Sequence, residues 1–507
     1  MTLKNKLCFI FTLILICFVS FIGFTFLYFI DNKYMDKTTI YYGHNGQIDL
    51  SNNNFNDNSV IQLCYNWDVY PNEYIPYNKI HSKEAPLNIF IGQYSGLDFG
   101  NKNSSYLGKA TYHLKIMLPE NVQLYTLELP EIFSSYQLYI NGNLLSQCGN
   151  IYNRNYHGST KSSSVSFLAK DCVDITLYVA NYSNIYGGLV YPPAFGSQDG
   201  VSKLLITRII FRCMVLFIIL TLCILFFFVG MKAHKIYFVY SLLALIFIGY
   251  SSYPITHWLF TTGIWVYHLE RFCSYFFILL ILYIHNKIFD IENENILTFK
   301  RQGKKQIILK LLFSFSIIIL LLTLVPAKII CINQITLKLY SSLLSFYKYS
   351  IFLYLIITTF YAVFNNVKYS MLLLSGFCVV ATSFLADRIY KLFEPIHFSW
   401  FYEISGFILI FIIGIILMLT FSDIYIKNKK LNTQIEMQKS YYSLVTENIY
   451  NTRKMRHNLK NHILVIKTFL EGNDFEKLKE YIENYAKELP SFKEMIFCEN
   501  DAINVLI

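Results

Sequence analysis

Three polar residues near the C-terminus have side chains and a spacing that suit chemistry, namely His457, Asn461 and His462. An imidazole can act as a nucleophile or as a base. At helical period, His457 and Asn461 share a face, and His462 lies on a different one. Neighbouring apolar residues form a separate stripe: Leu459, Ile463, Ile466 and Leu470. We therefore expect the ring of His457 to reach solvent or a docking partner.

A helical hairpin is the element that would position these residues. The composition of Glu471–Asp474 is typical of a turn, and Asn473 with Glu476 has the spacing of a capping box that opens a second helix. We expect that helix to end at Pro490. Its apolar residues follow in heptad steps: Phe475, Leu478, Ile482, Tyr485 and Leu489. Each hairpin leaves an apolar stripe that a second copy would cover, so the sequence predicts a homodimer with a four-helix bundle.

The hairpin resembles the phosphoacceptor and dimerisation segment of bacterial sensor histidine kinases, in the class with an Arg-His-acid-x-x-Asn pattern. The match runs from Arg453 to Leu489. It implies that His457 takes the γ-phosphoryl group of ATP and relays it to an aspartate of a response regulator. It also implies that Asn461 is the matching Asn, with His462 as the alternative acceptor. Asn458 stands where the class has a carboxylate, and an amide cannot act as a general base near neutral pH.

A kinase of this class also needs an ATP-binding domain of the GHKL type, which carries an Mg²⁺-binding Asn and Gly-rich segments. After Pro490 only residues 491–507 remain, and Asp501–Leu506 resembles the start of that domain. No Gly-rich phosphate loop is evident elsewhere in the sequence. We therefore expect this chain to hold no cofactor and no metal, with ATP and Mg²⁺ supplied by a missing or separate domain. Whether the chain is itself an enzyme stays open.

The composition is that of a membrane protein. Of the 507 residues, 54% are hydrophobic, which is too apolar for a soluble protein. Much of the formal charge of +10 sits beside hydrophobic spans, where cations hold a topology, so we expect no nucleic-acid partner. Residues 1–30 join Lys4 and Lys6 to an apolar run of membrane-spanning length. That run ends without small residues, which favours a signal anchor over a cleaved signal peptide.

Residues 31–203 are polar and aromatic, and they predict an extracellular β-sandwich of jelly-roll type. Alternation predicts strands, and Asn141-Gly142 predicts a hairpin turn after one of them. The expected strands cover 110–116, 122–129, 136–140 and 174–179. One disulfide among Cys64, Cys148 and Cys172 would leave one thiol over.

Two segments of this region resemble the extracellular sandwich of seven-transmembrane receptors with diverse intracellular signalling modules. They are Tyr139-Ile140-Asn141-Gly142, and Asn181-Tyr182-Ser183 with Gly187-Gly188. The resemblance implies an external small-molecule or carbohydrate ligand. The alternative is that the many aromatic residues serve the core and the strand faces.

Seven apolar spans follow within residues 204–425, and most loop cations fall opposite the sandwich, as the positive-inside rule requires. The spans start near Leu204, Lys235, Thr262, Ile307, Lys338, Tyr369 and Trp400. Ionisable residues in the outer part of the spans predict a polar network: Arg208, Arg212, Glu270, Arg271, Asp387, Arg388 and Glu403. This network either neutralises its own charges or passes the state of the sandwich to the helices.

The sequence thus predicts a multi-pass α-helical membrane protein with an extracellular β-sandwich and a cytoplasmic helical-hairpin dimerisation segment. Its segments are the anchor 1–30, the sensor domain 31–203, the seven-transmembrane region 204–425, a signalling helix 426–452, the acceptor hairpin 453–490 and the start of the missing ATP-binding domain, 491–507. The predicted function is that of a membrane sensor in a two-component system, with lipid, a second copy, a response regulator and an external ligand as partners. The alternatives are a non-catalytic receptor or decoy that dimerises with an intact kinase, and a transporter.

Overall fold

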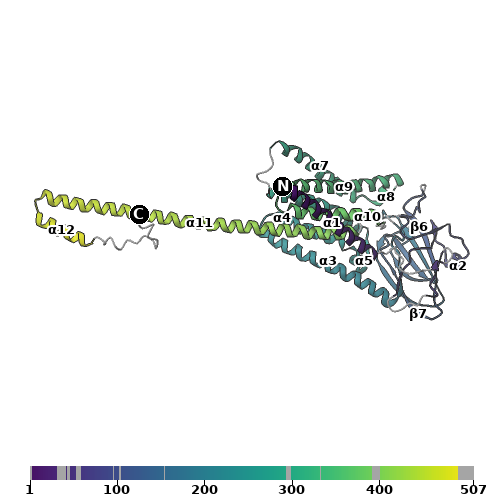
Figure 1. The fold of residues 1–507 in the computed structure, drawn as a ribbon. Coiled ribbons are helices and arrows are strands. Elements are labelled where there is room, and N and C mark those ends of the chain that lie inside the picture. Colours follow the sequence, from purple (N-terminus) through teal and green to yellow (C-terminus); the bar gives the residue numbers. More distant parts are fainter. Residues whose placement is uncertain are drawn as a thin grey trace. The chain divides into compact units, whose positions relative to one another are not determined.

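The computed structural model divides the chain into two compact units, Met1–Leu419 and Thr420–Ile507 (Figure 1). It describes residues 3–30, 41–42, 46–52, 59–94, 96–101, 104–152, 155–185, 187–292, 299–331, 333–390 and 400–488. The expected helix end at Pro490, with Leu489, and the segment 491–507 lie outside the described residues.

The first unit contains two larger sheets in its β-region, which we define as residues 41–197. An eight-stranded sheet has the order β1-β2-β6-β12-β8-β9, with β4 and β5 attached through β6. Its strands are β1 (Tyr41–Tyr42), β2 (Gln47–Asp49), β4 (Trp67–Pro71), β5 (Leu87–Ile89), β6 (Gly108–Met117), β8 (Ser135–Ile140), β9 (Asn143–Cys148) and β12 (Cys172–Asn181). A four-stranded sheet has the order β11-β7-β13-β3. Its strands are β3 (Val60–Gln62), β7 (Gln123–Leu129), β11 (Ser163–Ala169) and β13 (Ala194–Ser197).

The strands expected from alternation are confirmed, and so is the hairpin turn. Asn141 and Gly142 join β8 to β9 with φ values of 49° and 78°, the left-handed conformation that a tight two-residue hairpin requires. Pairing in the eight-stranded sheet is antiparallel except between β2 and β6. One buried apolar cluster draws side chains from both sheets, among them Leu114, Leu177 and Phe195. No disulfide joins Cys64, Cys148 and Cys172, which are all described residues, so the disulfide considered for them is not formed.

The other elements of the first unit are mostly long apolar helices. They are α1 (Leu3–Ile30), α3 (Gln198–Lys232), α4 (Ile236–Ser251), α5 (Tyr253–Leu259), α6 (Ile264–Glu292), α7 (Phe299–Thr323), α9 (Gln334–Phe364), α10 (Ser370–Ile389) and the start of α11 (Trp400–Glu471). Short elements complete it: α2 (Tyr77–Ile80), α8 (Ala327–Ile330), β10 (Ser159–Thr160) and β14 (Thr262–Gly263). Among the described residues, seven helices could cross a membrane, or eight if the bent pair α4 and α5 counts as one span. This set is compatible with a multi-pass membrane protein.

Helix α1 packs against helices from the far end of the apolar region. Phe24 is buried with Phe401, and their ring centroids lie 5.4 Å apart. The rings of Tyr28 and Tyr390 stack at 4.4 Å, and the hydroxyls of Thr25 and Tyr390 lie 2.8 Å apart. The first helix is therefore an integral part of this unit.

The second unit contains the remainder of α11 and the helix α12 (Phe475–Glu488). The turn between them is where we expected it. The predicted capping box of Asn473 and Glu476 is wrong, because the helix starts one residue later than that box requires. Helix α12 begins directly after Asp474, and Asn473 adopts a φ of 52° within the turn. Asn tolerates this left-handed conformation better than most residues, which explains its place there. The carboxylate of Asp474 accepts a hydrogen bond from Lys477 at 2.8 Å.

Candidate functional site

His457 lies on an exposed face of α11, one helical turn before Asn461. The amide nitrogen of Asn461 lies 3.3 Å from Nδ1 of His457. With the amide donating to Nδ1, a neutral ring carries its proton on Nε2. A group that attaches to Nε2 must displace this proton, and Asn458 next to the ring offers no base to receive it. The site therefore presents an accessible imidazole that lacks a neighbouring proton acceptor at position 458.

His462 has a different environment, between the two helices of the hairpin. Its Nδ1 lies 2.6 Å from the hydroxyl of Tyr481, and its ring centroid lies 3.9 Å from that of Tyr485. Phe469 adds a further ring contact with Tyr481. His462 thus packs α12 against α11, whereas His457 is open to solvent.

The apolar stripe predicted for a partner is not covered by α12. Leu459 is 51% exposed, Ile463 57% and Leu470 48%. On α12, Phe475 and Ile482 are exposed as well. The hairpin uses His462, Phe469, Tyr481 and Tyr485 for its own interior, so it leaves a row of large apolar side chains in water.

In the first unit, the β-region is joined to the apolar helices through backbone hydrogen bonds. Strand β10 pairs antiparallel with β14, which lies between α5 and α6. The backbone N–H of Ser162 donates to the carbonyl of His257 at 3.0 Å. The hydroxyl of Thr262 donates to the carbonyl of Thr160 at 3.1 Å. We call this connection the β10–β14 joint.

A buried ion pair lies beneath the β10–β14 joint. Nε2 of His257 lies 3.2 Å from a carboxylate oxygen of Glu270, and both residues are buried. Phe133 of the β-region contacts the rings of His257 and Tyr267, with centroids 6.2 Å away in each case. The aromatic ring therefore links the β-region to the helix that carries Glu270.

A second connection joins the β-region to α8 and α9. The side-chain amide of Gln334 donates to Asp98 at 2.8 Å and to the carbonyl of Asn101 at 3.1 Å. Ile185 is buried in one cluster with Ala327, Ile330 and other residues of α8 and its surroundings. Burial raises the pKa of Asp98, and the hydrogen bond from Gln334 opposes that shift.

Four charged residues of the predicted outer network have partners that the structure identifies. Arg212 pairs with Glu403. Glu270 pairs with His257, while the neighbouring Arg271 donates to the hydroxyl of Tyr340 and lies 5.4 Å from its ring. Each of these contacts joins two different helices.

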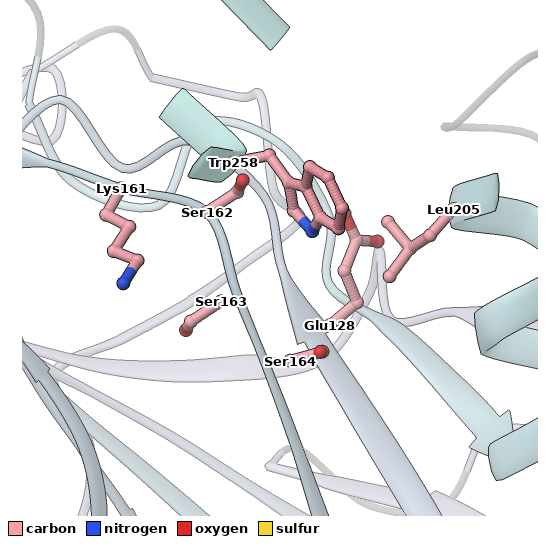
Figure 2. A pocket seen from close by; sticks show the side chains of 7 residues that line it. All are labelled: Glu128, Lys161, Ser162, Ser163, Ser164, Leu205 and Trp258. Carbon is pink, nitrogen blue, oxygen red and sulfur yellow. The ribbon is translucent and has the colours of Figure 1, made fainter. Parts of the chain in front are cut away.

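A small hollow opens where the β-region meets α3 and α5 (Figure 2). Its volume is about 230 Å³. Its walls consist of Glu128, Lys161, Ser162, Ser163, Ser164, Leu205 and Trp258. Ligand pockets usually exceed about 300 Å³, so this hollow suits water or a small ion better than an organic ligand. The hollow lies next to the β10–β14 joint, because Ser162 lines the hollow and its backbone N–H forms one of the hydrogen bonds of the joint.

Three residues of the β-region could hold a metal ion: His81, His113 and Asp174. One candidate ligand atom from each lies within 4.8 Å of the others. Burial alone would raise the pKa of Asp174, but the hydrogen bond from His113 and the nearby His81 lower it below the usual value. No short-range Cys or His spacing marks this group, because its members come from distant parts of the chain. Strand alternation is the one signal that places His113 and Asp174 on strand faces.

No protein-family model matches the sequence, and no curated protein matches it. Solved structures similar to part of the chain include the beta-glucuronidase of Faecalibacterium prausnitzii, with 12% identity over 27% of this chain and 31% of that one (TM-score 0.22). Another is the GH2 beta-galacturonidase of Eisenbergiella tayi, with 10% identity over 28% of this chain and 25% of that one (TM-score 0.21). A third is beta-glucuronidase 2 of Bacteroides uniformis, with 16% identity over 27% of this chain and 17% of that one (TM-score 0.21). The chain spans less than a third of each of these enzymes, and a likeness of this size carries no argument about its activity.

Proposed function

We propose that the chain is a membrane sensor of a two-component signal transduction system. In this proposal, the β-region is an extracellular jelly-roll-like sandwich that binds an external small molecule or carbohydrate. The apolar helices cross the cell membrane, and the C-terminal hairpin lies in the cytoplasm. A change in the β-region reaches the helices through the β10–β14 joint and alters how the hairpin presents His457.

The observation that carries the proposal is the placement of His457. Its ring is exposed on α11, which begins at Trp400 among the apolar helices and continues to Glu471. His462, the alternative acceptor, is held by Tyr481 and Tyr485 inside the hairpin. An in-line phosphoryl transfer needs an accessible nucleophile, and of these two residues His457 meets that need better.

The exposed apolar stripe supports a homodimer. Leu459, Ile463 and Ile482 would be covered if two hairpins packed into a four-helix bundle. In such a bundle the two copies of His457 would remain on outer faces, where a response regulator and an ATP-binding domain can approach.

The test is phosphorylation in trans. The full chain in lipid nanodiscs is incubated with Mg²⁺, radiolabelled ATP and the isolated ATP-binding domain of a histidine kinase of the same class. We expect acid-labile label that disappears in His457→Gln and persists in His462→Gln. Label that persists in His457→Gln and disappears in His462→Gln would refute the proposed acceptor.

The second candidate is a non-catalytic receptor or decoy that dimerises with an intact kinase and lowers its output. Asn458 favours this candidate, because the residue beside His457 cannot take the ring proton. A decoy would form mixed dimers with such a kinase and would stay unlabelled even with the added ATP-binding domain. Co-purification with label on the kinase partner alone would therefore distinguish it from the sensor.

A further inference from the structure

The group formed by His81, His113 and Asp174 is built into a rigid part of the β-region. His113 lies on β6 and Asp174 on β12, which pair along their whole length. Thr176 pairs with His113, so Asp174 is the diagonal neighbour of His113 on the same sheet face. The side chains of His113 and Asp174 are only 7% and 8% exposed. Two of the three groups therefore have fixed positions before any ligand arrives.

The loop around α2 supplies the third group. His81 follows α2 directly, and the last residue of that helix, Ile80, is buried. The hydroxyl of Tyr70 donates to the carbonyl of Lys83 at 2.8 Å, which ties the end of this loop to β4. The side chain of His81 is 47% exposed, so the group is open to solvent on one side.

Neighbouring groups hold both the backbone and the carboxylate of Asp174 in place. The backbone N–H of Asp174 donates to the side-chain oxygen of Asn141 at 2.8 Å, and the backbone N–H of Asn141 donates to the carbonyl of Asp174 at 2.9 Å. The hydroxyl of Tyr77 donates to one carboxylate oxygen of Asp174 at 3.4 Å. Outer contacts of this kind orient ligands in metal sites.

The distances within the group also allow its members to share one metal ion. Nε2 of His113 lies 3.3 Å from Oδ1 of Asp174, and Nε2 of His81 lies 3.5 Å from Oδ2. Charge-assisted N–H···O hydrogen bonds are usually about 2.7–2.9 Å long. Two ligands with bonds of about 2.0–2.1 Å to a tetrahedral zinc ion lie about 3.3–3.4 Å apart. Each imidazole nitrogen thus lies near this separation from one oxygen of the Asp174 carboxylate, and one ligand atom from each of the three residues lies within 4.8 Å of the others.

We propose that His81, His113 and Asp174 bind one divalent metal ion of the zinc class, with a fourth position open to water. Two imidazoles and one carboxylate with an open position form a common zinc ligand set. Other charged residues lie near the group on β6 and β4: Lys115 interacts electrostatically with Asp174, and His113 interacts electrostatically with Asp68. The charge of Asp68 offsets that of Lys115, so the neighbourhood does not repel a cation.

The test measures zinc on the full chain, purified in detergent without a polyhistidine tag and stripped with a chelator. Elemental analysis after reloading and desalting should give one zinc ion per chain that depends on the three residues. We expect His113→Gln and Asp174→Asn to lose it, and His81→Gln to bind at least about tenfold more weakly. His157→Gln is the matched control, because this histidine of the same region contacts Ser159 and not the group.

His81→Gln keeps the test decisive if a buried variant fails to fold, since its side chain is half exposed. Its metal-free thermal unfolding should match that of the unchanged protein.

Cobalt provides a second readout, because a site of nitrogen and oxygen ligands gives weak visible bands without a thiolate charge-transfer band. Equal zinc affinity in His81→Gln and the unchanged protein would overturn the proposal. A cobalt–thiolate band would also overturn it, because the bound ion would then lie on cysteines. Neither readout depends on phosphorylation at His457.

Discussion

At the level of single residues, the contrast between His457 and His462 defines what the hairpin can do. Both are imidazoles on α11, yet one faces solvent beside Asn461 and the other lies against two tyrosines. Accessibility and proton acceptance are separate requirements for phosphoryl transfer. In this chain the residue at position 458 supplies no base for the second requirement.

We therefore predict that Asn458→Asp speeds labelling of His457 by an added ATP-binding domain by about tenfold or more, because a carboxylate can take the ring proton. Initial rates of acid-labile label measure the effect. Asn448→Asp, on the same helix but distant from His457, is the control and should leave the rate unchanged. An equal rate in Asn458→Asp and the unchanged chain would show that proton transfer does not limit the reaction.

A second residue-scale prediction concerns the ion pair beneath the β10–β14 joint. His257→Ala would leave the buried Glu270 without this partner, which costs about 3 kcal/mol for a group of this kind. We expect a lower midpoint of thermal unfolding in detergent. Trp265→Ala is the control, because that side chain is 82% exposed. An unchanged midpoint for His257→Ala would mean that the pair adds nothing to stability.

At the level of elements, the apolar stripe of the hairpin leads to a prediction about assembly. A fragment from Lys430 to Ile507 should be a helical dimer, and Ile482→Asp should dissociate it. A charge left unpaired in the bundle core costs about 3–5 kcal/mol. Sedimentation and circular dichroism measure mass and helicity. Lys479→Asp introduces the same side chain at another exposed position of α12 and should leave the dimer intact. A folded, monomeric fragment without substitutions would contradict the homodimer.

The sequence predicts elements that have local signals better than it predicts sites that are assembled from distant residues. Alternation and the Asn-Gly turn are local signals, and they predict β6, β8 and the turn after it. The register that sets Thr176 opposite His113 depends on pairing across the sheet, which no local pattern encodes. His81 comes from a loop, so alternation cannot place it. The β10–β14 joint also escapes prediction, because strands of two residues are too short to carry a period.

At the level of the whole molecule, the proposed orientation puts the β-region outside the cell and the hairpin inside. Asn155→Cys, at an exposed site of the β-region, should react with an impermeant maleimide in intact cells. Glu447→Cys, at an exposed site of α11, should react only after the membrane is opened. Gel shifts relative to the parent protein, which carries its own cysteines, give the readout. Labelling of Glu447→Cys in sealed cells would overturn the orientation and the signalling proposal with it.

The packing of α1 has a consequence for how the protein is made. Thr25 and Tyr390 touch although 365 residues separate them in the chain. The helix that leaves the ribosome among the first residues therefore completes its contacts only after α10 and the start of α11 have been synthesised. Until then its aromatic face, including Phe24, lacks the partners that bury it in the folded unit. A chain whose synthesis stops before Phe401 would therefore lack the ring that covers Phe24, while the contacts of α1 with Phe360 and Tyr390 could already form.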